Sequence, residues 1–148
     1  TVEELAQAKE LVKTHQAKLA SGNQDPASLE YSSSYIMIRR FQNVINRYEQ
    51  QQSSATLPVE VHIIRLGDIA IATNRFEYFL DSGIRIKARS PAIQTFVVQL
   101  AGEGSYLPTE RALQGKSYGA TPENSFVTPA GGQLLVDETV RLITELFS

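Results

Sequence analysis

Residues 57–72 read LPVEVHIIRLGDIAIA, and this stretch decides the fold class. Its first half alternates apolar and polar side chains, which is the period of a β-strand with one buried face. The pair Gly67-Asp68 can form a tight turn, and residues 69–72 are apolar on both faces, as in a strand at the centre of a sheet. The stretch therefore predicts a β-hairpin whose second strand is central.

The sequence after the hairpin predicts a helix, a strand, a loop and a final helix. Residues 77–87 are suited to a short helix, and residues 93–100 are rich in β-forming side chains, with the run Phe96-Val97-Val98 indicating burial on both faces. Residues 101–129 are mostly loop, and the last helix is expected after Gly131-Gly132. These elements predict an α/β fold in which a mixed sheet packs against three or four helices.

The sequence before the hairpin predicts two helices. Residues 2–20 place apolar side chains near a 3.5-residue repeat, and Ser21-Gly22-Asn23 is a stop signal. A second helix is expected to begin near Asp25-Pro26, because Asp can cap a helix and Pro suits its first turn. We therefore expect an antiparallel helical pair over residues 1–54 and an α/β segment over residues 55–148, together forming one folded unit.

Composition argues against several kinds of partner and site. The 148 residues carry 14 Lys and Arg against 16 Asp and Glu, without a long run of either sign, so neither nucleic acid nor an anionic membrane is an expected partner. No stretch approaches the roughly 20 apolar residues of a transmembrane helix, and no signal peptide is recognisable. Cysteine is absent, which excludes disulfides, thiolate nucleophiles and cysteine-based zinc sites. Because the first residue is Thr1 rather than Met, we expect a processed product, a shortened chain or a fragment.

Glu77 is a candidate metal ligand. It follows the apolar strand at residues 69–72, and side chains at the carboxyl ends of buried strands point into the crevice where α/β proteins bind their ligands. The alternative is that Glu77 only occupies the first turn of the following helix. There its charge would interact favourably with the helix dipole, by roughly 0.3–1 kcal/mol.

Tyr106 and Tyr118 are candidate site residues in the long polar loop. A phenol can bind a metal as phenolate, or it can donate a hydrogen bond to a developing oxyanion. The alternative is that both tyrosines anchor the loop through an apolar ring and a polar tip. The only histidines, His15 and His62, have no partner at metal-site spacing, so the chain by itself cannot assemble a histidine-based zinc centre. A glycine-rich phosphate loop and a serine nucleophile elbow are both absent from the sequence.

The order of these motifs resembles the C-terminal part of the catalytic domain in the neutral/alkaline (non-lysosomal) ceramidase family. In that family an apolar hairpin ends in a Gly-Glu-Phe-like element, and a strand, a Tyr-x-x-Thr element and a second tyrosine twelve residues after the first follow it. The resemblance covers residues 57–147, and the altered loop is most similar to the compact bacterial members. The corresponding segments here are Phe76-Glu77-Tyr78, Phe96-Val97-Val98, Tyr106-Leu107-Pro108-Thr109 and Tyr118-Gly119-Ala120.

The resemblance implies a site and a reaction. Glu77 and Tyr106 would be zinc ligands, and Tyr118 would contact the tetrahedral intermediate of amide hydrolysis by metal-activated water. Two histidine ligands would come from the N-terminal half of the same catalytic domain, which is therefore an expected partner. The substrate would be an N-acyl lipid or a related amide, and the sheet would belong to a larger layered domain. Secretion or a periplasmic location is suspected from the resemblance alone.

Three departures from the family pattern leave a second function open. Phe76 stands in place of the glycine before the glutamate, Pro108 replaces a threonine, and Gly119 replaces a glutamate after the second tyrosine. Phe76 and Gly119 both adjoin proposed site residues. The alternative is therefore a binding or interaction domain that keeps the scaffold without a working metal site.

Overall fold

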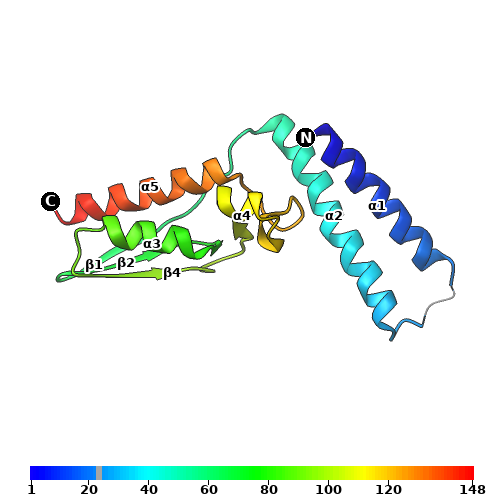
Figure 1. The fold of residues 1–148 in the computed structure, drawn as a ribbon, viewed down its shortest axis with the longest axis horizontal. Helices are drawn as coiled ribbons and strands as arrows, with labels where there is room; N and C mark the ends of the chain where they lie inside the picture. The colour runs from blue at the N-terminus through cyan, green and yellow to red at the C-terminus, as the bar shows by residue number, and fades with distance from the viewer. Residues whose placement is uncertain (23–24) are drawn as a thin grey trace. The chain divides into compact units, whose positions relative to one another are not determined.

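The computed structural model describes residues 1–22 and 25–148. The contacts within the described residues divide the chain into two compact units, residues 1–56 and residues 57–148. The first unit is a pair of helices, α1 (Val2–Ala20) and α2 (Leu29–Ser53), which pack side by side (Figure 1). Their shared core is formed by Ala8, Val12, Val44 and Ile45.

The second helix begins later than predicted, at Leu29 rather than near Asp25-Pro26. The Ser28 hydroxyl caps it by accepting a hydrogen bond from Tyr31 N–H at 3.1 Å. The Asp25 carboxylate instead accepts a hydrogen bond from Ala27 N–H at 2.9 Å in the preceding turn. Asn23, the last residue of the predicted stop signal, lies outside the described residues.

The second unit contains the predicted mixed sheet, so the chain has an α/β fold. Strands β1 (Ile63–Leu66), β2 (Ile69–Thr73) and β4 (Gln94–Val98) lie in the order β1-β2-β4. The pair β1–β2 is antiparallel and the pair β2–β4 is parallel, which confirms that the second hairpin strand is central. Gly67 in the hairpin turn has a φ of 60°, a conformation that glycine adopts without steric cost.

One face of this sheet is covered by two helices. Helix α3 (Leu80–Arg89) connects β2 to β4, and α5 (Pro129–Leu146) lies beside it over the same face (Figure 1). Apolar side chains from the sheet, α3 and α5 fill the space between the sheet and the helices. Burial of these side chains away from water is the main stabilising contribution to the unit. These buried side chains are Ala70, Ala72, Ile86, Val136, Val140 and Ile143.

A second, two-stranded sheet pairs β3 (Glu77–Tyr78) with β5 (Tyr106–Leu107) in parallel. The segment predicted as mostly loop also contains α4 (Glu110–Gln114) and the 3-10 helix η1 (Tyr118–Ala120). Among the described residues, no helix is both long enough and apolar enough to cross a membrane.

Several predicted elements of the second unit differ from the observed ones. The first hairpin strand begins at Ile63 rather than near Leu57, and the last helix begins at Pro129, before Gly131-Gly132. The helix expected from residue 77 begins at Leu80, because Glu77 and Tyr78 pair with β5 instead. Strand β4 is not buried on both faces, since Phe96 is 50% exposed and Val98 is 44% exposed. Both side chains lie on the sheet face that α3 and α5 do not cover.

Candidate functional site

The parallel pairing of β3 with β5 sets Glu77 directly opposite Tyr106. Glu77 N–H donates to the Ser105 carbonyl at 3.0 Å, and Tyr106 N–H donates to the Asn124 carbonyl at 3.1 Å. Paired residues of neighbouring strands point to the same side of a sheet. The structure therefore brings together an acid and a phenol that are remote along the chain.

The strand carrying Glu77 is held in place by its buried neighbours. The Asn74 side chain is buried and its Oδ1 accepts a hydrogen bond from Phe76 N–H at 2.7 Å. The Phe76 side chain is fully buried, and its carbonyl accepts a hydrogen bond from Leu100 N–H at 3.2 Å. Phe76 thus anchors the strand in the core, and the next side chain, Glu77, is half-buried.

The electrostatics of the site follow from this pairing. The negative charge of Glu77 raises the pKa of the Tyr106 phenol above its ordinary value, because a phenolate would form beside a carboxylate. Desolvation and hydrogen bonding to Glu77 act in the same direction, and Tyr118 adds a smaller contribution. Without a cation, Tyr106 is therefore a neutral hydrogen-bond donor to Glu77.

The Tyr106 ring lies between two other aromatic rings. The Tyr118 ring is edge-on to it, with centroids 6.0 Å apart and an interplanar angle of 81°. The Phe79 ring also contacts the Tyr106 ring, with centroids 6.2 Å apart and an interplanar angle of 55°. Both distances fall in the range of favourable aromatic pairs. Tyr118 remains 54% exposed, so its ring lies where a ligand from solvent can reach it.

Gly119 allows the Tyr106 ring to take this position. A Cβ atom at residue 119 would lie 2.6 Å from Tyr106 Cγ and 3.1 Å from Phe79 Cζ. A glycine at residue 119 therefore has a packing reason in this chain. Sequence reasoning found neither Phe79 nor the role of Gly119, and the only available signal was the glycine directly after Tyr118.

The structure also bears on the alternatives drawn from the sequence. Glu77 is not a first-turn acid of a helix, because it lies in β3 and Asp81 occupies the first turn of α3. His15 belongs to the helical pair, where its Nδ1 lies 3.3 Å from the Ser34 hydroxyl oxygen. His62 lies 3.1 Å from a Glu60 carboxylate oxygen. Among residues 1–22 and 25–148, no three His, Cys, Asp or Glu side chains are grouped so that they could hold a metal ion.

Glu77 and Tyr106 therefore offer two oxygen donors, which is fewer than the four ligands of a usual zinc site. Two clefts of the α/β unit, with volumes of about 630 Å³ and 470 Å³, are lined by other residues. The larger cleft contains His62, Arg75 and Glu103, and the smaller one lies between α3, α4 and α5. Neither of these two clefts is lined by Glu77 or Tyr106.

Comparison of the chain with models of protein families, with curated proteins and with solved structures gives no match. A function is therefore inferred from the geometry of Glu77, Tyr106 and Tyr118. The arrangement offers a carboxylate, an adjacent phenol and a second, accessible phenol. Such a set can bind a cation through oxygen and donate a hydrogen bond to an anionic oxygen.

Proposed function

We propose that the chain supplies the C-terminal half of the active site in a zinc-dependent amide hydrolase similar to the neutral ceramidases. The observation that supports this most is the register of β3 and β5, in which Glu77 faces Tyr106. The remaining ligands, two histidines, would come from the N-terminal half of the same catalytic domain, outside this chain. In this proposal the small mixed sheet is one part of a larger layered domain, and the substrate is an N-acyl lipid or a related amide.

Each residue has a distinct role in the proposed reaction. When bound, zinc would lower the pKa of a water ligand towards about 7 and polarise the amide carbonyl. Glu77 would hold the cation as a carboxylate. Tyr106 would ligate as phenolate, which requires the loss of the proton that it shares with Glu77, so zinc binding would release a proton and weaken at low pH. Tyr118 would donate a hydrogen bond to the tetrahedral oxyanion, worth on the order of 3 kcal/mol.

The proposal predicts the zinc content of the full-length protein. Purified wild-type protein should contain bound zinc, and Glu77→Gln should lower its zinc affinity at least about tenfold, because an amide is a poorer ligand than a carboxylate. Elemental analysis after dialysis against a weak chelator measures this. The control is Glu103→Gln, which alters an acid in a cleft that Glu77 does not line. Equal zinc content in wild type and Glu77→Gln would rule out Glu77 as a ligand.

A second candidate function is a binding or interaction domain without a working metal site. Two observations favour it: a glutamate at residue 119 would collide with Tyr106, and one face of the sheet exposes apolar side chains. Absence of zinc from the wild-type full-length protein, together with an intact fold, would support this candidate over the hydrolase.

A further inference from the structure

Within the α/β unit, as far as the described residues go, one face of the three-stranded sheet is uncovered. Ala70 and Ala72 of β2 point into the core beneath α3 and α5, so the alternate residues Ile69 and Ile71 point to the opposite side. The strand register extends this face to both neighbouring strands, because cross-strand partners share a side. We call it the outer sheet face, and its apolar members are Ile64, Leu66, Ile69, Ile71, Phe96 and Val98.

The strand residues of the outer sheet face carry no formal charge; the ion pair of His62 with Glu60 lies just before β1, where His62 N–H donates to the Thr73 hydroxyl. The remaining members of this face, Thr73 and Gln94, are the register partners of Val98 and Ile69 and are uncharged. The cation on β1, Arg65, points to the other side, where its Nη1 donates to the Leu146 carbonyl at 2.6 Å. The face is therefore apolar across all three strands.

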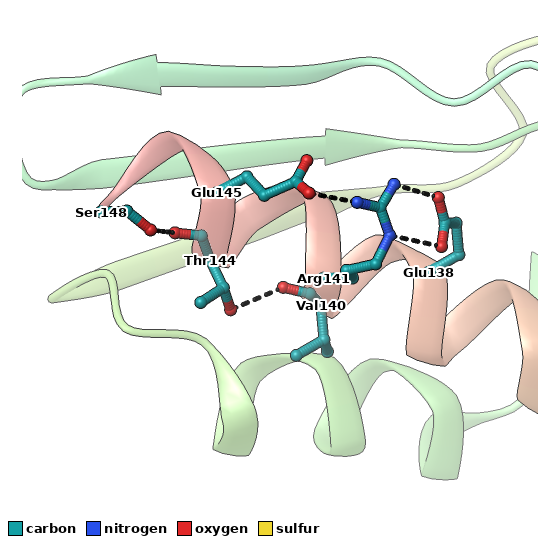
Figure 2. Close-up of polar contacts among 6 residues, drawn as sticks. All are labelled: Glu138, Val140, Arg141, Thr144, Glu145 and Ser148. Atoms are coloured by element: carbon teal, nitrogen blue, oxygen red, sulfur yellow. Dashed lines mark hydrogen bonds and ion pairs between the residues drawn. The ribbon is translucent and has the colours of Figure 1, made fainter.

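The helical layer has the opposite character. On α5, Arg141 forms a bidentate ion pair with Glu138, at 2.8 Å and 2.5 Å, and a further ion pair with Glu145 (Figure 2). Arg89 on α3 pairs with Asp137 on α5 at 2.5 Å. These side chains are about half exposed, and they suit permanent contact with water. The helical layer thus carries ion pairs beside exposed apolar side chains such as Leu134, whereas the strand residues of the outer sheet face carry no charge.

The exposed apolar area suffices for an interface. Ile64 is 52% exposed, Leu66 is 67% exposed, and Phe96 and Val98 are 50% and 44% exposed. With the half-buried isoleucines of β2, this leaves on the order of 500 Å² of apolar surface in water, which is at the upper end of what monomers expose. If this surface were buried on two copies, roughly 1,000 Å² of accessible surface would be removed from water, which is the lower limit of a specific interface even before surrounding residues are counted.

We propose that the outer sheet face binds the same face of a second copy of this chain. A two-fold interface must be complementary to itself, and a face without charge presents no like-charge repulsion to its own copy. The two twisted sheets would pack about 10 Å apart with their strands roughly aligned. Both helical layers would then lie on the outside, with their ion pairs in water. This inference does not depend on the proposed zinc site.

The experiment is sedimentation equilibrium of the full chain over a range of concentrations, with two charge substitutions on the edge strands. The wild type is expected to dimerise. Leu66→Lys and Phe96→Lys, singly and together, introduce a like charge on each copy, and the double variant should raise the dimer dissociation constant about a hundredfold. Because both positions are at least half exposed, the fold should persist, which circular dichroism checks.

The matched control is Leu134→Lys, because Leu134 is an exposed leucine, 71% accessible, on α5 in the helical layer. This variant should dimerise as the wild type does. A wild type that is monomeric at every concentration would overturn the proposal, whether its outer sheet face is open or is covered by another segment. A folded Leu66→Lys variant that dimerises with unchanged affinity would overturn it as well.

Discussion

Gly104→Ala is expected to destabilise the α/β unit by about 3 kcal/mol or more. A Cβ atom at residue 104 would lie 1.9 Å from the Arg75 carbonyl oxygen, 2.6 Å from the Arg75 carbonyl carbon and 3.2 Å from Phe76 Cα. All three are backbone atoms. These backbone atoms cannot move aside easily, because the Phe76 side chain is fully buried and Glu77 N–H donates a hydrogen bond to the Ser105 carbonyl. The substitution would therefore separate β3 from the segment that leads into β5.

Chemical denaturation of wild type and Gly104→Ala measures this loss as a change in the free energy of unfolding. The control is Gly83→Ala within α3, where a Cβ atom would meet nothing within 4 Å. Alanine is a better helix former than glycine, so this control should be neutral or more stable by roughly 0.5–1 kcal/mol. Equal stability of Gly104→Ala and wild type would contradict the close approach of residues 75 and 104.

Gly119→Ala is expected to displace the Tyr106 ring and to disrupt the site more than the fold. The added Cβ atom would lie 2.6 Å from Tyr106 Cγ and 2.7 Å from Cδ1. A side chain can rotate away where backbone cannot, so the expected loss of stability is smaller, about 1–3 kcal/mol. The displaced phenol would leave Glu77, and the pKa of Tyr106 would fall towards its ordinary value.

Two measurements are needed to follow this variant: the free energy of unfolding, and an ultraviolet absorbance titration of the tyrosines. The control is Gly131→Ala in α5, where the nearest atom to the added Cβ would be 3.4 Å away, an ordinary contact. An unchanged Tyr106 pKa in Gly119→Ala would show that Gly119 does not position the ring.

The parts of the fold that the sequence predicted are those that local pattern determines. The alternation from Leu57 and the apolar run of β2 predicted the hairpin and its central strand, and both are observed, although the first strand occupies only Ile63–Leu66. The predicted first helix coincides with α1, where Thr1 and Glu4 form a capping box. In these segments the local signal and the tertiary packing agree.

Other features depend on contacts between distant segments, and these were not predictable. Glu77 and Tyr78 have an acceptable helical pattern, yet pairing with β5 makes them a strand. The apolar run in β4 matches a strand buried on both faces, but helices cover one face, and Phe96 remains half exposed. Apolar composition cannot distinguish a covered face from one that is available for binding.

The sequence suggested candidate residues but not the geometry that brings them together. The order of Glu77, Tyr106 and Tyr118 suggested that they act together, and in the structure Tyr106 lies opposite Glu77 and against the ring of Tyr118. What the sequence could not give is the register of β3 with β5, because two-residue strands carry almost no local signal. The supporting roles of Phe76 and Gly119 likewise depend on packing that becomes visible only in the folded chain.

The central claim is that Glu77 and Tyr106 form one site, and the pKa of Tyr106 tests it most directly. Burial also raises the pKa of Tyr78, to about 12, so the signal of Tyr106 must be separated from that of Tyr78. The difference between wild type and Tyr106→Phe isolates the signal of Tyr106. The difference between Glu77→Gln and the double variant Glu77→Gln, Tyr106→Phe isolates the signal of Tyr106 in the absence of the carboxylate.

The Glu77 charge opposes formation of the phenolate, so its removal must make Tyr106 easier to ionise. The expected result is a Tyr106 pKa above the ordinary value in wild type and a lower pKa in Glu77→Gln, with Glu103→Gln behaving as wild type. An identical Tyr106 pKa with and without the Glu77 charge would contradict the shared site.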